Sequence, residues 1–160
     1  MRNLIYQYWD GNSFPGVAAG TQAMKKYAED LGVGKYVTFT GRVSDEEMLA
    51  VLNTADVCVN PDIANDMNDK STMNKIMEYM ALGKPVVQYD LTEGRVSAQA
   101  ASLYAKENDE IDLADKIVLL LDDKELRNKM GSLGRERVVN ELQWEYEAPK
   151  LLAAYDMLFQ

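Results

Sequence analysis

The sequence predicts an α/β fold: one domain with a parallel sheet of about five strands and helices on both faces. Three observations predict it. Short apolar segments alternate along the chain with longer segments of helical period. Several of the short segments have an unbroken apolar core, which is typical of parallel strands covered on both faces. No internal repeat, low-complexity tract or linker divides the 160 residues, so we expect a single domain over 1–160.

The strands are recognised as apolar or alternating segments that end at turn residues. They are expected at 4–9, 36–41, 56–61, 84–90 and 101–105. The second, YVTFTG, alternates apolar and β-branched residues and stops at Gly41. The third and fourth, DVCVNP and KPVVQYD, have the unbroken apolar cores.

Helices are expected in the intervals and at the C-terminal end. The segments are 18–31, one beginning after Ser44, 71–82, one capped by Asp109, 123–140 and 145–159. Ser44 with Glu47 three residues later forms a capping box. The helix after Asp109 has apolar side chains sharing one side at Ile111, Ala114, Ile117, Val118 and Leu121. In the last helices, packing is expected of Trp144, Tyr146 and Tyr155.

Composition excludes several classes of function. The formal net charge is −9, from 17 Lys and Arg against 26 Asp and Glu, and an acidic chain repels nucleic acid. There is no histidine, and Cys58 is the one cysteine, which disfavours disulfides, histidine acid–base chemistry and the common zinc ligand sets. Cys58 is expected to be a small buried apolar group rather than a nucleophile. No apolar run is long enough to cross a membrane, so a soluble protein of the reducing cytosol is expected.

Ligands of parallel sheets bind beyond the carboxyl ends of the strands, where loops lead into helix N-termini. The loops that qualify are 10–16, 41–44 and 61–71. The last leads into the helix expected at 71–82, with Ser71 as N-cap and Gly83 at its end. The apolar stripe of this helix, expected to face the core, consists of Met73, Ile76, Met77 and Met80. The amides of Thr72, Met73 and Asn74, beside Lys70, then suit a diphosphate.

Glu78 lies on another side of the same helix, in line with Asn74 and Lys75. Two interpretations are open. A rigidly held carboxylate can accept both hydroxyl groups of a ribose whose phosphates are bound at the helix start. Alternatively, Glu78 is an exposed side chain paired with Lys75.

Two other charged segments also have two interpretations each. The loop NDMND (65–69), with Asp62 nearby, could hold a hard cation, but acidic loops are usually only solvated, and we expect no metal. After the fourth strand, Arg95 either assists the phosphates or belongs to a plain surface turn.

Four ordered motifs carry a family resemblance: VTFTGRV, ADVCVNPD, STMNKIMEYMALGKPVVQYD and KIVLLLDDKELRNKMGSLGRERV. They cover 36–159 and resemble the C-terminal lobe of family four retaining glycosyltransferases of the GT-B fold, within which the chain looks most like bacterial enzymes that build cell-surface polysaccharides. The resemblance implies a Rossmann-like, nucleotide-sugar-binding domain. It also implies an N-terminal acceptor-binding lobe, which is absent from this chain.

The resemblance implies roles for individual residues. Glu78 matches the second glutamate of the family's E-x7-E motif, which binds the donor ribose in relatives. Ser71, Thr72 and Met73 match the loop that contacts sugar and phosphates through its amides, and 41–43 matches the turn that frames the nucleobase. The expected donor site therefore comprises Gly41, Arg42, Val43, Lys70, Ser71, Thr72, Met73, Asn74, Glu78 and Arg95.

The chain departs from the family pattern in three places. The first glutamate of E-x7-E falls at Lys70. The Arg and Lys that neutralise the pyrophosphate in relatives have no counterpart. Residues 1–35 are atypical, because Trp9 stands where relatives have the first glycine of a Gly-Asp-Gly turn.

We therefore expect the UDP- or GDP-sugar donor-binding lobe of a retaining glycosyltransferase in cell-surface polysaccharide biosynthesis, a lobe that binds without turnover of its own. Its expected partners are the nucleotide-sugar and the acceptor-binding lobe. No cofactor or metal is expected, and no catalytic residue is assigned. A cytoplasmic location is expected, with or without peripheral contact of the whole enzyme with the inner membrane. The alternative function is a non-catalytic α/β scaffold or interaction module without ligand affinity.

Overall fold

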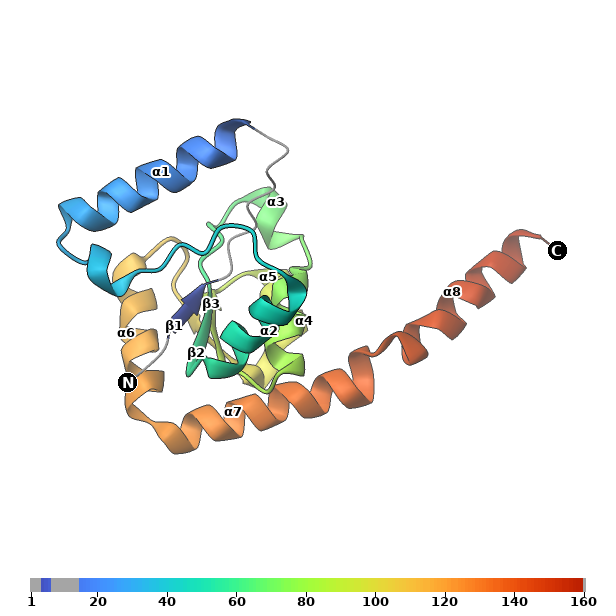
Figure 1. Ribbon diagram of the computed structural model, residues 1–160. Helices are drawn as coiled ribbons and strands as arrows, with labels where there is room; N and C mark the ends of the chain where they lie inside the picture. The colour runs from blue at the N-terminus through green and yellow to red at the C-terminus, as the bar shows by residue number, and fades with distance from the viewer. Residues whose placement is uncertain (1–3, 7–14, 160) are drawn as a thin grey trace. The chain divides into compact units, whose positions relative to one another are not determined.

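The computed structural model describes residues 4–6 and 15–159 (Figure 1). Contacts between residues divide the chain into two compact units, one of residues 1–7 with 51–160 and the other of residues 8–50. The larger unit contains the sheet and both of its helical layers. That residues 1–160 form one domain stays a prediction.

A parallel sheet forms the centre of the larger unit (Figure 1). Its strands are β1 (Leu4–Tyr6), β2 (Val57–Asn60), β3 (Val86–Tyr89) and β4 (Ser102–Ala105), hydrogen-bonded in that order. Cys58 is opposite Val86, which is in turn opposite Ser102, and all neighbours run in the same direction. Every residue of β2 and β3 is buried, as their apolar sequences predict. The α/β fold with a parallel sheet is confirmed.

The prediction of a strand at 36–41 is wrong. A 3-10 helix, η1 (Gly34–Tyr36), occupies its start, and residues 37–40 have no regular structure. A strand needs a neighbour for its backbone hydrogen bonds, and the described part of the 8–50 unit contains none. No packing compensates, since the exposed fraction is 77% for Tyr36 and 41% for Val37. The described residues therefore form four strands instead of about five.

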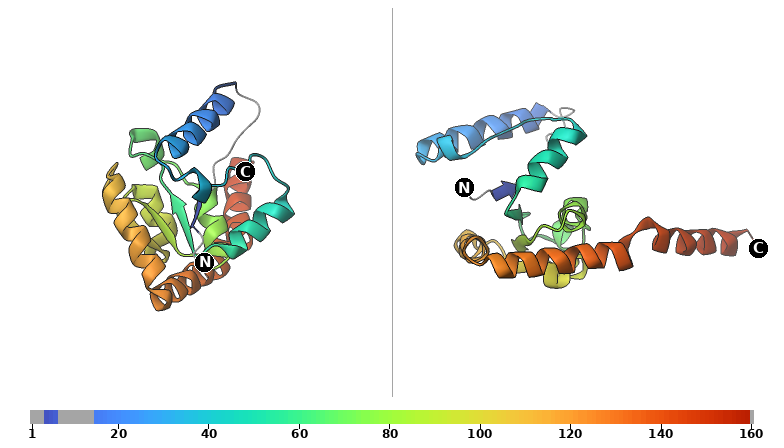
Figure 2. Two further views of the ribbon diagram at one scale, coloured as in Figure 1. Left: turned by 60° about the vertical axis from the view of Figure 1, so that its left-hand side comes forward. Right: turned by 60° about the horizontal axis from the view of Figure 1, so that its bottom comes forward.

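Helices cover both faces of the sheet. On one face, α6 (Glu110–Asp122) contributes Leu113 and Leu120 to a core cluster with alternate residues of β2 and β3. Met130 of α7 (Lys124–Arg137) joins this cluster, and Gly134 of α7 lies against Met80 of α4. On the other face lies α5 (Thr92–Ala98), because the side chain of Gln88 in β3 lies against Gly94 of α5. The helix α4 (Asn74–Ala81) packs beside α5, and Ile76 and Met80 share a core cluster with Ala98. Only Asp123 separates α6 from α7, and Figure 2 shows the sharp change of direction there.

The buried side of α6 differs in part from the expected one. Leu113 and Leu120 are buried, and Ile117 and Leu121 pack partly against the same cluster. The expected side included Ile111 and Val118, whose exposed fractions are 69% and 55%. Two apolar stripes share this helix, and the sheet selects the one centred on Leu113 and Leu120.

Glycines allow α4 and α7 to approach closely. Gly83 has φ +68° and follows the last turn of α4, as predicted for its stop. A Cβ atom on Gly131 of α7 would lie 2.1 Å from the carbonyl oxygen of Gly83. The contact between the two helices therefore requires glycine at position 131.

The remaining helices of the described residues are α1 (Pro15–Asp30), α2 (Asp45–Thr54), α3 (Asp66–Asp69), the 3-10 helix η2 (Gln99–Ala101), the π-helix η3 (Val138–Leu142) and α8 (Trp144–Leu158). Two predicted caps are confirmed. The Ser44 hydroxyl accepts from the amide of Glu47 at 3.2 Å, and the Asp109 carboxylate accepts from the first amides of α6.

The last helix, α8, has no buried residue. The packing expected of Trp144, Tyr146 and Tyr155 is wrong, since their exposed fractions are 63%, 47% and 53%. The Tyr155 ring instead stacks on Phe159, with centroids 6.5 Å apart. Over residues 4–6 and 15–159, no helix combines the length and apolar character needed to cross a membrane.

Candidate functional site

After β2 and its loop, helix α4 starts later in the chain than the sequence predicts. The expected N-cap is Ser71, but the helix starts at Asn74 with Met73 as its N-cap. The Ser71 hydroxyl donates instead to the carbonyl of Met67, at 2.5 Å, and so completes the end of α3. A short helix that the sequence analysis did not predict thus takes the hydroxyl that was expected to cap α4.

The N-terminal end of α4 has free backbone donors. Among the described residues, the amides of Thr72, Met73 and Asn74 have no hydrogen-bond acceptor. The first turn of α4 contains no acidic residue and Met73 provides no side-chain cap, so nothing in the helix itself neutralises the positive end of its dipole. These are the three amides that the sequence predicts for an anion.

Glu78 is exposed on α4, four residues after the first helical residue, Asn74. This spacing is about 6 Å along the helix axis, one turn rather than the two that a start at Ser71 implies. The alternative pairing of Glu78 with Lys75 is wrong, because Lys75 Nζ lies 2.8 Å from a carboxylate oxygen of Asp62. Within the described part of the chain, the Glu78 carboxylate has no hydrogen bond or ion pair with protein.

Of the two basic site residues in this unit, Lys70 is the one without a hydrogen bond or ion pair to a carboxylate among the described residues, although its charge contributes to lowering the pKa of the neighbouring Asp69. Arg95 is bound to Asp90 through two hydrogen bonds, one of them 2.6 Å from Nη2 to Oδ2, and these bonds raise the pKa of the guanidinium. The guanidinium also lies 4.4 Å from the centre of the Tyr104 ring. Arg95 belongs to α5, so its interpretation as part of a surface turn is wrong.

Three hydrogen bonds join the end of α3 and the loop after it to the start of α5. The amide of Thr92 donates to Asp69 Oδ1 at 2.7 Å, and its hydroxyl donates to Asp69 Oδ2 at 3.0 Å. The hydroxyl of Thr72 donates to Glu93 Oε2 at 2.9 Å. The structure thus brings Thr72, a predicted site residue, together with Glu93, while Lys70 lies between the two contacts in the chain.

The expected nucleobase turn, Gly41, Arg42 and Val43, lies in the 8–50 unit. Gly41 has φ +65°, a left-handed conformation that glycine adopts without strain, as a tight turn requires. Gly41 and Arg42 are exposed and Val43 is half-buried. Their role beside the nucleobase stays a prediction.

The acidic residues that raise the question of a cation are engaged separately. Asp62 pairs with Lys75 and Asp69 accepts from Thr92. In the described ranges, no group of three or more His, Cys, Asp or Glu side chains is placed to hold a metal ion. Cys58 is fully buried in β2, and burial raises the pKa of its thiol to about 12, which keeps it protonated at neutral pH.

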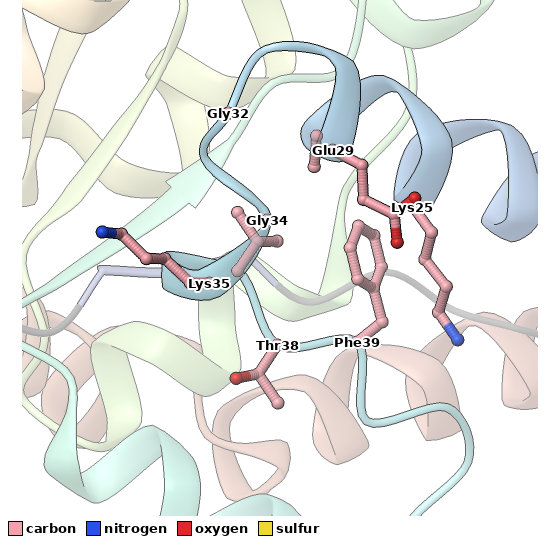
Figure 3. Close-up of a pocket in the computed structure, with 9 residues that line it drawn as sticks. Lys25, Glu29, Gly32, Gly34, Lys35, Thr38 and Phe39 are labelled. Atoms are coloured by element: carbon pink, nitrogen blue, oxygen red, sulfur yellow. The ribbon is translucent and has the colours of Figure 1, made fainter.

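Neither of two cavities in the described residues is lined by a predicted site residue. The 8–50 unit has an open pocket of about 660 Å³ lined by Lys25, Glu29, Gly32, Gly34, Lys35, Thr38 and Phe39 with Ala28 and Val37 (Figure 3). Lys25 Nζ lies 5.8 Å from the centre of the Phe39 ring. A smaller cavity, about 230 Å³, is lined by residues 98–101 and the end of α7.

Sequence reasoning missed the groups that hold the site together. It considered Asp69 only as part of a cation loop and assigned no role to Thr92, nor to Asn60, the last residue of β2, and Gln88 of β3, which is in register with it. Both amides are buried, and Asn60 Oδ1 and Gln88 Oε1 have no hydrogen-bond partner among the residues that the structure describes. A polar residue within an otherwise apolar strand is the signal that could have drawn attention to Asn60 and Gln88.

Comparison with known proteins relates this geometry to one family. Residues 12–123 match the family described as Glycosyl transferases group 1. A sucrose-phosphate synthase from Thermosynechococcus elongatus has a similar structure, with a TM-score of 0.80 and 27% sequence identity. That similarity covers 98% of this chain and 38% of the synthase.

Two curated relatives are similar in sequence. One, from Mycobacterium tuberculosis, is a GDP-mannose-dependent alpha-(1-6)-phosphatidylinositol monomannoside mannosyltransferase and is 30% identical over 148 residues. The other, a D-inositol 3-phosphate glycosyltransferase from Corynebacterium efficiens, is 31% identical over 156 residues. The matches cover 89% and 96% of this chain, which spans only 38% and 35% of the two relatives.

Proposed function

The chain belongs to the glycosyl transferases group 1 family, and we propose that it is the lobe of a retaining enzyme that binds the nucleotide-sugar donor. One observation carries the proposal. The three free amides of Thr72, Met73 and Asn74 lie at the start of a helix whose Glu78 carboxylate, one turn further, has no partner among the described residues. Amides at a helix start suit a diphosphate, and a free carboxylate suits the two hydroxyl groups of a ribose.

The expected chemistry is electrostatic. When the bond between sugar and phosphate breaks, negative charge develops on the departing nucleoside diphosphate. Amide donors and the positive end of the α4 dipole stabilise that charge, and Lys70 supplies a cation beside them. Arg95 is a weaker candidate for phosphate binding, because Asp90 already neutralises its charge.

The activity of a whole enzyme belongs to the proposal as well. We propose that its partner is an acceptor-binding lobe and that its donor is a UDP- or GDP-sugar. The whole enzyme would take part in the biosynthesis of cell-surface polysaccharide and would be located in the cytoplasm. GDP is the first nucleotide to test, because the name of the M. tuberculosis relative includes GDP-mannose.

The test is calorimetric titration of the chain with GDP and UDP. Glu78→Ala is expected to weaken binding of the preferred nucleotide by about tenfold, because the ribose loses hydrogen bonds to a charged acceptor. Glu136→Ala is the matched control: Glu136 is also an exposed helical glutamate without a partner among the described residues, and it should leave the affinity unchanged.

Two results would contradict the proposal. Equal affinity of the wild type and Glu78→Ala removes Glu78 from the site. Absence of binding at millimolar concentrations of either nucleotide favours the alternative, a non-catalytic scaffold or interaction module.

A further inference from the structure

We propose that Asp69 is a positioning residue for the donor site: together with Thr92 it holds loop 70–73 in place, so that the free amides at the start of α4 point at the ligand. The inference rests on the proposed function, because the loop matters for binding only if the donor phosphates bind there. Asp69 contacts Thr92 of α5 and is not proposed to contact the nucleotide itself.

The backbone of loop 70–73 has little support of its own. The amides of Lys70 and Ser71 donate to α3 at 3.3 Å each, and the amides of Thr72 and Met73 have no acceptor among the described residues. No strand or helix therefore determines the conformation of Thr72 and Met73.

Side chains provide the missing support at both ends of the loop. Before it, both carboxylate oxygens of Asp69 accept from Thr92, at 2.7 Å from the amide and 3.0 Å from the hydroxyl. Within it, the hydroxyl of Thr72 donates to Glu93 at 2.9 Å. Both partners lie in the first turn of α5, which packs on the sheet through Gly94 and Gln88. The loop is thus tied to a rigid element.

Because Asp69 is charged, a positioning role and a direct electrostatic effect on the ligand predict opposite changes in affinity. Thr92 lowers the pKa of the Asp69 carboxyl group, which is therefore ionised at neutral pH. A negative charge close to a diphosphate weakens its binding, so loss of the charge by itself would increase affinity. A positioning role makes the opposite prediction, because loss of the two hydrogen bonds releases the loop.

The experiment compares Asp69→Ala, Asp69→Asn and the control Asp115→Asn in the full chain. An asparagine can accept from the Thr92 amide and donate to its hydroxyl, so it keeps both contacts without the charge. Asp115 is an exposed aspartate of α6 without a partner among the described residues. The two readouts are calorimetric affinity for GDP and UDP, and amide hydrogen exchange of residues 70–74.

Asp69→Ala is expected to weaken nucleotide binding about threefold to tenfold and to speed exchange of residues 70–74. Asp69→Asn and Asp115→Asn are expected to bind at least as tightly as the wild type and to exchange at the wild-type rate. Thr92→Val, which removes only the hydroxyl contact, is expected to give a smaller change in the same direction as Asp69→Ala. It serves as the test if the alanine variant does not fold.

Unchanged or tighter nucleotide binding by Asp69→Ala overturns the positioning role, and so does unchanged exchange of residues 70–74. If neither the wild type nor any variant binds GDP or UDP, the proposed function fails. Hydrogen exchange still decides in that case whether Asp69 holds the loop.

Discussion

At the scale of single residues, the site depends on which charges are already neutralised. Lys75 is bound to Asp62 and Arg95 to Asp90, whereas Lys70 and Glu78 form no hydrogen bond or ion pair with another described residue. A charged group without a protein partner keeps its capacity for a ligand, because it gives up only water on binding. Lys70 and Glu78 are therefore the charged side chains of the proposed donor site that can bind a ligand.

The Asp69 carboxylate gives the structure a defined pH dependence. The pKa of Asp69 is lower in the folded chain than its ordinary value of 3.8. The contribution of its contacts to stability is thus fully present above that value and is lost as the pH falls through the lower, folded pKa. The difference in unfolding free energy between wild type and Asp69→Ala should be constant from pH 5 to 8 and shrink below about pH 4.

Urea unfolding at several pH values measures this difference. Asp115→Asn serves as the control and should show no comparable trend, because the exposed Asp115 side chain has no hydrogen bond or ion pair among the described residues. A difference between wild type and Asp69→Ala that grows below pH 4 would contradict the assigned direction of the shift.

At the scale of elements, the contact between α4 and α7 holds the site helix on the sheet. It depends on Gly131, at which a Cβ atom would meet the carbonyl oxygen of Gly83 at 2.1 Å. A backbone atom cannot move aside as the end of a flexible side chain can. The two helices would have to separate instead.

Gly131→Ala is therefore expected to destabilise the chain by about 1–3 kcal/mol, even though alanine favours helix. Ser132→Ala, at the neighbouring exposed position of α7, should change stability by no more than about 0.5 kcal/mol. Urea denaturation of both variants provides the comparison. A Gly131→Ala variant as stable as the wild type would mean that α4 and α7 do not approach as closely as the structure has them.

At the scale of the whole molecule, the two units differ in how much they bury. The core clusters belong to the larger unit, in which β2 and β3 are buried throughout. In residues 21–50, the one buried side chain is Ala28. Local stability follows buried contacts, so the two units are not expected to be equally stable.

Native-state hydrogen exchange should reveal this difference. We expect the amides of Val57–Asn60 and Val86–Tyr89 to exchange at least about a hundredfold more slowly than those of α1. Equal protection of α1 and the central strands would contradict it, since the exposed residues of the smaller unit would then have to be covered in solution.

Much of the fold follows from the sequence itself, for local reasons. The parallel strands are predicted by apolar runs, the start of α2 by the hydroxyl of Ser44, and the stop of α4 by Gly83. Each of these signals involves only a few neighbouring residues, so it can be recognised in the sequence alone. The expected strand at 36–41 failed because a strand also needs a partner, which no local pattern provides.

Only the tertiary structure decided how the candidate site is assembled. Lys75 meets Asp62 across 13 positions, and Thr92 meets Asp69 across 23. Ser71 is drawn to α3, and so α4 begins at Asn74. Long-range contacts of this kind depend on which segments the sheet brings side by side, and periodicity and capping patterns carry no information about them. The sequence determined that a helix bearing Glu78 follows a buried strand, and folding determined that the Glu78 carboxylate stayed available to a ligand while Lys75 and Arg95 were paired.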